Sequence, residues 1–477
     1  MDILSPTFVL VTITAAFILN FIALKYRVLY LVLLSSVFLS LIDLKLLVYV
    51  LAYSGINFYW GKRIAQDRKN ATFYRIAIAF NLLQLVLLHY ADFIIDPVFE
   101  WFNSSVRVSL LSELLVPIGI SYFTLQGIGY IINVKMGWEK PEKRFDHFFL
   151  YISFFPKFLA GPIERSKHFL PQLKGKMQFT ESNFINGLRL ILYGLFKKIA
   201  IANELAPYVM DSFRNVEEFN GASLLVMTLI LPLYLYFDFS AYTDMAIGLA
   251  RCFNIELLDN FKRPFFSENM TVFWRRFHIT LGSWFNEYVF RQFSFKFRKW
   301  GTYATVYGVF ITWILFGVWH GAGWNFFALG VLQAVAIYYE FFTKKWRYRI
   351  YSHWPNSLRI WFGRVVTYLF YSVSLVFFFA PNLKYAFDYL AKLLSFSGEL
   401  PLDALSTKPI FLLIYVPVIF LLELLENDYP DYNAKLRNVW YAKTKKSRIL
   451  RWGIYSTLIT IMFIQGLKSE QFVYANF

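Results

Sequence analysis

Long apolar segments separated by short polar ones run along almost the whole chain. Each is close to the roughly 20 apolar residues that an α-helix needs to cross a bilayer. The pattern predicts spanning helices at 4–24, 72–95, 111–134, 184–207, 222–249, 301–319, 321–340, 357–380, 408–426 and 448–467. Asp43 and Lys45 interrupt residues 28–60, which predicts two short helices that form a hairpin around a polar turn. We therefore expect an all-α polytopic membrane protein with about 11–12 transmembrane helices.

One apolar segment does not fit a simple spanning helix. FFLYISFFPKFLAGPIER, residues 148–165, lies between two basic segments and is broken by Pro156, Gly161 and Pro162. Non-helical backbone at membrane depth is tolerated only where protein or a cavity surrounds it. The segment therefore predicts a re-entrant loop.

An amphipathic helix is expected after residue 266. Ser267 is a candidate N-cap for it. Five apolar residues then fall on one face at helical spacing: Phe273, Phe277, Leu281, Trp284 and Tyr288. Such a helix lies in the membrane interface rather than across the bilayer. His278 lies at the edge of this stripe, so its side chain is expected to point inward.

The composition agrees with a membrane protein. Hydrophobic residues make up 57% of the 477 positions and charged residues 17%, which is too apolar for one soluble core of this length. The net charge of +17 comes from clusters between the apolar segments, where Lys and Arg meet anionic lipid head groups, so we do not expect nucleic-acid binding. The single cysteine, Cys252, excludes an intramolecular disulfide and a cysteine-based metal cage.

The basic clusters support one orientation in the membrane, since cytoplasmic loops carry the Lys and Arg excess. An alternating topology places Lys25–Arg27, Lys62–Lys69, Lys135–Arg144, Arg251–Arg276, Lys344–Arg349 and Lys435–Arg451 inside, and residues 96–110, 208–220 and 381–407 outside. The first apolar run lacks a basic start and a cleavage site, so we interpret it as a retained span with its N-terminus outside. Lys197 and Lys198 fall within a predicted span and are expected to extend to the inner interface, unless that helix is shorter.

No linker, repeat or low-complexity segment divides the chain. We interpret residues 1–477 as one membrane domain. Its chemically distinctive motifs lie in 110–345, between N-terminal spans in 1–109 and C-terminal spans in 346–477.

The strongest candidate for chemistry is His320, in the apolar stretch TWILFGVWHGAGWNFF. Residues 301–340 enter and leave on the same inner side, which places His320 at the apex of a helical hairpin or on a bend inside the membrane. An ionisable side chain there is a functional-site hypothesis, although a lone histidine is more often a packed, hydrogen-bonded one. The neighbouring candidates are Trp319, Gly321 and Trp324, and the small residues after His320 permit close backbone approach.

A second polar cluster interrupts YLYFDFSAYTDMAIGLARCFNI, residues 234–255. Ser240 and Asp244 are four residues apart and therefore share a helix face that should look into the protein. With Asp238 they are candidates to line a substrate path, or they pair with arginines in the helix bundle. Trp274 and Arg275 are further candidates, and the alternative for Arg275 is a lipid-facing charge.

Other kinds of site have little support in the sequence. Neither HExxH, a P-loop nor GxSxG occurs, and the six histidines do not show metal-ligand spacing, so we expect neither a metal nor a tightly bound cofactor. Two histidines among membrane aromatics suit proton abstraction from a hydroxyl group. The matching reaction is acyl transfer from an activated thioester.

Five stretches of the chain carry a family resemblance. They are LLVPIGISYFTLQGIGYIINV (114–134), FFPKFLAGPIER (154–165), YFDFSAYTDMAIGLA (236–250), NFKRPFFSENMTVFWRRFHITLGSWFNEYVF (260–290) and ILFGVWHGAGWNFF (314–327). Together they resemble the membrane-bound O-acyltransferases, in the bacterial branch typified by the alginate O-acetyltransferase membrane subunit and the teichoic-acid D-alanyl transfer protein. The chain departs from the alginate-type pattern at Asn133, at Phe379 and in RQFSFKFRKWG after residue 290.

The resemblance implies a ring of helices around a thin central tunnel. It implies His320 as the catalytic residue and His278 as the second family histidine. It also implies acetyl-CoA or an acyl carrier thioester as the donor, a polysaccharide acceptor and an exported SGNH-type transferase as a partner.

Our leading hypothesis is an acyltransferase of the bacterial inner membrane that moves acetyl groups outward to an extracytoplasmic polysaccharide. D-alanyl or other acyl transfer from an acyl carrier protein is the alternative within the same class. A transporter of an acyl or lipid-linked intermediate and a scaffold for polysaccharide secretion are the alternatives from other classes.

Overall fold

The computed structural model describes residues 6–90, 119–175, 178–396, 398 and 412–466, and its regular elements there are helical. The α-helices are α1 (Pro6–Leu19), α2 (Arg27–Ile42), α3 (Leu44–Gln66), α4 (Thr72–His89), α7 (Ile120–Met136), α8 (Phe145–Ser153), α9 (Ser166–Lys174), α10 (Glu181–Phe196), α11 (Asn203–Arg214), α12 (Gly221–Cys252), α13 (Met270–Trp274), α14 (Ile279–Phe285), α15 (Arg291–Lys296), α16 (Thr302–Trp319), α17 (Trp324–Phe342), α18 (Lys344–Tyr351), α19 (Asn356–Phe379), α20 (Leu383–Leu394), α22 (Leu412–Asp428), α23 (Pro430–Tyr441) and α24 (Lys445–Gln465). Two π-helical turns, η3 (Lys197–Ala202) and η6 (Asn286–Phe290), and the 3₁₀ turn η2 (Phe155–Lys157) matter for the site.

Several of these helices can cross a bilayer. Five in the described part of the chain are long and apolar enough: Leu24–Ile42, Gly221–Cys252, Thr302–Trp319, Trp324–Phe342 and Asn356–Phe379. Helix α2 shows how such a helix meets lipid, because Leu29, Leu33, Val37 and Leu41 are exposed at a spacing of four residues. The all-α polytopic class is confirmed. The total of about 11–12 spans stays a prediction, and the expected outer segment 96–110 lies outside the described residues.

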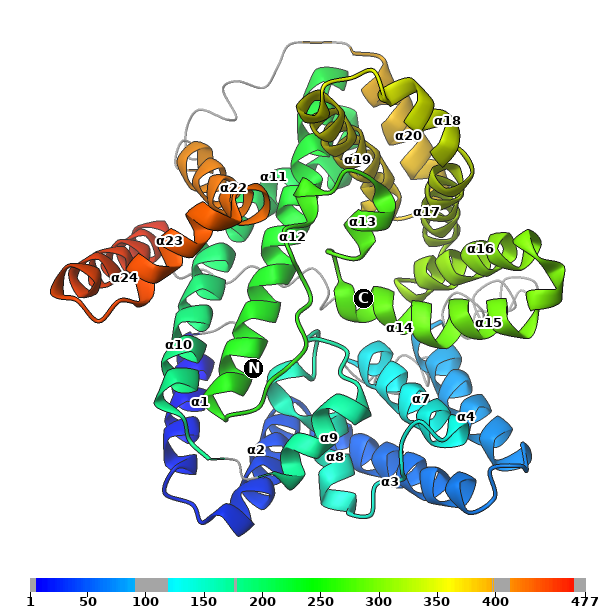
Figure 1. Cartoon of the computed structure of the whole chain (residues 1–477), viewed down its shortest axis with the longest axis vertical. Coiled ribbons are helices and arrows are strands. Elements are labelled where there is room, and N and C mark those ends of the chain that lie inside the picture. Colours follow the sequence, from blue (N-terminus) through cyan, green and yellow to red (C-terminus); the bar gives the residue numbers. More distant parts are fainter. Residues whose placement is uncertain (1–5, 91–118, 176–177, 397, 399–411, 467–477) are drawn as a thin grey trace.

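The helices surround two short ones. Figure 1 shows α13 and α14 near the middle of the view, with α12, α19, α17, α16 and α7 around them, while α22, α23 and α24 extend to one side. Helix α12 packs against α10, α11 and α19, and α16 packs along α17. The residues of α13 and α14 therefore lie inside a shell of longer helices.

The predicted hairpin at 28–60 is present, with a difference in length. Helices α2 and α3 meet at Asp43, whose side chain accepts a hydrogen bond from the Lys45 backbone N–H (2.7 Å) and caps α3. With 16 and 23 residues the two helices are longer than expected.

The amphipathic helix predicted from Ser267 is wrong as one continuous element. Asn269, not Ser267, caps α13 through its side chain, and the helix stops after five residues. The chain around Phe277 instead pairs with Phe261 in an isolated β-bridge, in which Lys262 N–H donates to Arg276 O and Ile279 N–H to Asn260 O. These bonds take the backbone groups that a helix would use. The predicted aromatic stripe is nevertheless buried.

The hairpin of α16 and α17 depends on two glycines. A Cβ on Gly317 would lie 2.3 Å from Phe326 O and 2.8 Å from Gly330 N, so the two backbones touch where neither residue has a side chain. Close approach of this kind is how helices associate in a membrane. It places the end of α16, and with it His320, against α17.

Gly317→Ala should therefore destabilise the protein, by about 1–3 kcal/mol, because the added methyl must push the helices apart. Gly55→Ala is the matched control, since a Cβ on this glycine of α3 meets nothing within 4 Å. Thermal unfolding in detergent should show a lower midpoint for Gly317→Ala and an equal or higher one for Gly55→Ala. Equal midpoints would contradict the close contact.

Candidate functional site

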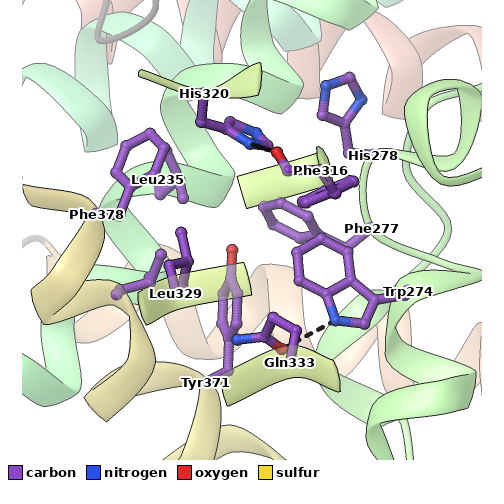
Figure 2. A pocket seen from close by; sticks show the side chains of 11 residues that line it. Leu235, Trp274, Phe277, His278, Phe316, His320, Leu329, Gln333, Tyr371 and Phe378 are labelled. Atoms are coloured by element: carbon purple, nitrogen blue, oxygen red, sulfur yellow. Dashed lines mark hydrogen bonds between the residues drawn. The ribbon is translucent and has the colours of Figure 1, made fainter. Parts of the chain in front are cut away.

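His320 and His278 line one narrow cavity inside the helix shell (Figure 2). Its volume, counted as the space that the centre of a water molecule can reach, is about 20 Å³. Its walls come from α12, α13, α16, α17, α19 and the start of α14: Leu235, Trp274, Phe277, His278, Phe316, His320, Leu329, Gln333, Tyr371, Leu375 and Phe378. We call it the histidine chamber. In the part of the chain that the structure describes, none of the lining residues is acidic.

His320 follows the last residue of α16 and is buried. Its Nδ1 lies 2.8 Å from Phe316 O, which can only accept, so Nδ1 donates. In the neutral ring Nε2 is then the basic nitrogen. Rings of Phe316, Trp319 and Phe378 pack around the imidazole at centroid distances of 4.8, 4.9 and 5.7 Å.

His278 is held in a less common backbone conformation. Its φ of 48° and ψ of 51° are left-handed, a region that a residue with a Cβ occupies only at a cost of roughly 1–2 kcal/mol. Strain of this kind persists where the surroundings enforce it, often at functional sites. It turns the His278 ring into the chamber, as expected from the sequence, where the ring meets Phe239 edge to face at 4.7 Å.

Asn260 fixes the orientation of the His278 ring. Its Oδ1 accepts from the Thr280 backbone N–H (3.2 Å) and from Thr280 Oγ1 (2.9 Å), which identifies this atom as the amide oxygen. His278 Nδ1 lies 3.1 Å from the same oxygen and therefore donates to it. Both chamber histidines thus carry their proton on Nδ1 and have Nε2 as the basic nitrogen.

The segment predicted as a re-entrant loop supports these histidines from behind. Helix α8, the turn η2 and the irregular residues that follow are buried almost throughout. Ile163 N–H donates to Thr280 Oγ1 (3.0 Å), and Arg165 donates to Thr280 O (3.1 Å) and to Ser283 Oγ (3.2 Å). Glu164 accepts from the Leu258 backbone N–H (2.6 Å). The motif GPIER therefore anchors both chain segments that carry Asn260 and His278.

A larger cavity lies beside the chamber. By the same measure its volume is about 340 Å³. Its lining residues are Thr271, Trp274, Arg275, Ile279, Gly282, Ser283, Phe285, Asn286, Phe290, Val309, Thr312, Trp313, Phe316 and Ile337. Trp274 and Phe316 line both cavities, so they form the wall between them. We call this larger space the vestibule. Its polar groups and its position next to the basic residues that follow Phe290 distinguish it from the chamber.

Three of the predicted site residues are bonded to buried lysines, two of them as ion pairs. Lys198 Nζ lies 2.7 Å from Asp238 Oδ1, and Lys197 Nζ lies 2.6 Å from Asp244 Oδ2 and 3.0 Å from Ser240 Oγ. Ser240 and Asp244 share a face, as predicted. None of the three lines the chamber or the vestibule.

The expectation that Lys197 and Lys198 extend to the interface is wrong. Both lysines are buried in η3, where each is paired with an aspartate of α12. Charges in an apolar interior are stable only when they are paired in this way.

The remaining predicted residues have different positions. Trp319 packs between the two imidazoles, 4.9 Å from His320 and 6.3 Å from His278 between ring centroids. Gly321 lies against the Phe326 ring, and Trp324 is exposed at the start of α17. Arg275 is exposed and lines the vestibule. The two single-residue departures from the alginate-type pattern, Asn133 and Phe379, line neither cavity.

Sequence reasoning missed Asn260, Gln333 and Tyr371. Asn260 lies 18 residues before the histidine that it orients, and no local periodicity links the two. Gln333 and Tyr371 lie on predicted spans. A polar side chain within a span was the available signal for both, because such residues usually face a cavity or a partner.

Together the fold and the site define a multi-pass membrane protein with two buried imidazoles that line one chamber. Among the described residues no group of three or more His, Cys, Asp or Glu side chains is placed to hold a metal ion. Comparisons with known proteins agree with this class.

Residues 144–380 match the family model of the membrane-bound O-acyltransferases. The chain is 30% identical over 379 residues to the probable alginate O-acetylase AlgI of Azotobacter vinelandii, covering 78% of this chain and 73% of that protein. It is 30% identical over 405 residues to the peptidoglycan O-acetyltransferase of Helicobacter pylori, covering 78% and 74%. It is 29% identical over 266 residues to the teichoic acid D-alanyltransferase of Bacillus subtilis, covering 53% and 66%.

The chain belongs to the membrane-bound O-acyltransferase family, and the protein is a membrane acyltransferase. The resemblance found in the sequence is thereby confirmed. The chemical roles of individual residues are not decided by these comparisons, and they remain predictions.

Asn260→Leu should lower acyl transfer by about 100-fold, because His278 loses the acceptor that sets its tautomer and orientation. Asn81→Leu is the matched control, since Asn81 is equally buried and bonds Tyr53 and Asn57 far along the chain from the chamber. Transfer per folded molecule should fall only in the first variant. Equal losses would show that Asn260 has no specific role.

Asp238→Asn should destabilise the protein by about 3–5 kcal/mol, because Lys198 is left buried without its counter-charge. Adding Lys198→Met to the same chain should restore much of the lost stability. Unfolding midpoints of the single and double variants in detergent test this. If the double variant is less stable than Asp238→Asn alone, pairing with Lys198 is not how Asp238 stabilises the protein.

Proposed function

We propose that the protein is an O-acetyltransferase of the bacterial inner membrane, which takes acetyl groups from a cytosolic thioester and passes them to an acceptor hydroxyl on the outer side. The observation that carries this proposal is the histidine chamber. Two imidazoles line a space that is small and mostly apolar. An uncharged acetyl group suits such a space.

The dimensions and lining of the chamber favour acetyl over D-alanyl. A D-alanyl group carries an ammonium, and transferring an unpaired ammonium into apolar surroundings is strongly unfavourable. Among the residues that the structure describes, no acidic side chain lines the chamber to pair with it. The similarity to the teichoic acid D-alanyltransferase of Bacillus subtilis keeps D-alanyl transfer as the second candidate.

His320 acts as the general base in this proposal. Its Nε2 accepts the proton of the acceptor hydroxyl while that oxygen attacks the thioester carbonyl carbon. The carbon–sulfur bond of the resulting tetrahedral intermediate then breaks, and the thiolate takes the proton back from the imidazolium. His278, held by Asn260, assists from the second side of the chamber. The hydrogen bond to Phe316 O keeps the His320 ring in one orientation throughout.

The vestibule is the donor's route to the chamber. It lies beside Phe290, and the residues that follow carry Arg291, Lys296, Arg298 and Lys299, which the charge pattern assigns to the inner side. The donor is acetyl-CoA or an acetylated carrier protein. An SGNH-type transferase outside the membrane and a polysaccharide are the acceptor partners that we infer from the family resemblance.

His320→Ala should abolish acetylation of the cell-surface polysaccharide while the protein stays in the membrane at normal levels. His353→Ala is the matched control, because His353 is exposed in the loop between α18 and α19. Acetate released from isolated polysaccharide by mild base measures the effect. A normal amount of released acetate in the His320→Ala strain would contradict the proposal.

Purified protein given labelled acetyl thioester separates the enzyme from a transporter. Label released or transferred by the parent protein, and not by His320→Ala, supports the enzyme. Passage of intact thioester across a proteoliposome membrane without cleavage would support the transporter. Labelled D-alanyl thioester in place of acetyl should give a much lower rate, and a higher one would favour the second candidate.

A further inference from the structure

Gln333 is a buried amide on the wall of the histidine chamber. Its side chain is 0% exposed, and its Oε1 accepts from Trp274 Nε1 at 3.1 Å. Its Nε2 has no hydrogen-bond partner in the described residues. A buried donor without a partner lowers stability, so a position of this kind calls for an explanation.

The orientation of this amide is determined by α13. An indole N–H can only donate, so the oxygen of Gln333 must face Trp274 and the nitrogen must face away. Helix α13 is itself fixed on α17, because Glu340 accepts from the backbone N–H groups of Met270 (2.5 Å) and Thr271 (3.0 Å). Gln333 and Glu340 are seven residues apart and lie on one face of α17. One helix thus holds both ends of α13.

Gln333 lies on the chamber side of the wall between the two cavities. Trp274, its hydrogen-bond partner, is one of the two residues that line both. In Figure 2 the amide nitrogen of Gln333 lies on the side of Tyr371, opposite the oxygen that meets Trp274. A donor arm that entered the chamber past Trp274 would lie beside Gln333.

The distance from Gln333 to His320 limits what the amide can bind. Gly317 and Gly330 face each other in the α16–α17 hairpin. His320 lies three residues after Gly317, towards the turn of the hairpin. Gln333 lies three residues after Gly330, away from that turn. At the rise of an α-helix the two side chains start roughly 9 Å apart along the hairpin. A thioester carbonyl at His320 is therefore too far away for Gln333, and the group it meets lies further along the donor.

We propose that Gln333 is a donor-binding residue, whose NH₂ group donates a hydrogen bond to the first amide carbonyl of a pantetheine arm while the acyl group occupies the histidine chamber. This inference rests on the proposed function. In a pantetheine thioester a sulfur, two methylene groups and a nitrogen separate the acyl carbon from that amide carbonyl. That spacing suits an acyl group at His320 and an acceptor oxygen at Gln333.

The same arm occurs in acetyl-CoA and in acylated carrier proteins, so Gln333 binds the chemistry that both share. Recognition of the amide by Gln333 does not depend on which of the two supplies the acyl group. An amide-free thioester of equal length lacks the group that Gln333 recognises. Comparing donors with and without the amide therefore tests Gln333 itself.

The experiment measures binding to purified protein in nanodiscs. The probes are acetonyl thioethers, in which a methylene between sulfur and carbonyl prevents cleavage: one of N-acetylcysteamine, which has the first amide, and one of pentanethiol, which lacks it. The parent protein should bind the amide probe about tenfold more tightly. Gln333→Met should bind both probes alike, with unchanged affinity for the amide-free probe.

Gln84→Met is the control for loss of a buried glutamine. Gln84 bonds Tyr49 and Thr124 on helices away from the chamber, so this variant should keep the tenfold preference. The amide-free probe also reports whether the chamber of Gln333→Met remains folded. A preference that persists in Gln333→Met, or that is absent from the parent protein, would overturn the inference.

Two further arms identify the source and separate this inference from the proposed function. Acetonyl-CoA and an acetonyl-pantetheinyl carrier protein should each lose about tenfold in affinity for Gln333→Met, and the tighter of the two is the physiological source. The proposed function fails instead if His320→Ala turns over acetyl thioester as fast as the parent protein. That result leaves the role of Gln333 in binding intact.

Discussion

The site depends on two hydrogen bonds that hold imidazole Nδ1 atoms against oxygens that can only accept. Phe316 O fixes His320 and Asn260 Oδ1 fixes His278. Each bond satisfies a buried polar group and at the same time leaves Nε2 as the basic nitrogen of the neutral ring. The broken helix, the left-handed backbone at His278 and the anchoring by Thr280 all serve to bring these pairs together. In the proposed mechanism, activity therefore depends on these supporting residues as well as on the histidines.

Burial of charge imposes a second constraint on the same bundle. The lysines of η3 enter the apolar interior only because α12 supplies Asp238 and Asp244 at matching heights. Such pairs are weak contributors to stability, yet breaking one is costly. They fix how α10 and α12 pack, and α12 carries Leu235 into the wall of the chamber. Residues that looked chemical in the sequence thus have a structural role one layer behind the site.

The sequence predicted the helical class, the burial of His320 and the inward direction of His278 because each leaves a local signal. The length of an apolar segment indicates a membrane span, and a lone polar residue within a span indicates that its side chain faces a cavity or a hydrogen-bond partner. The break at His278 had no such signal, since it arises from pairing with Phe261 across the chain. For the same reason Asn260 and the ion pairs of Lys197 and Lys198 required three-dimensional contacts. The resemblance supplied the family, whereas the structure supplied the supporting bonds.

The most direct test of the central claim is an experimental structure of the protein with a bound, uncleavable acetonyl thioether of coenzyme A. We expect density for the acyl carbonyl between His320 and His278, with the pantetheine arm passing Trp274 into the vestibule. Density for the acyl end outside the histidine chamber, with the two imidazoles unoccupied, would contradict it.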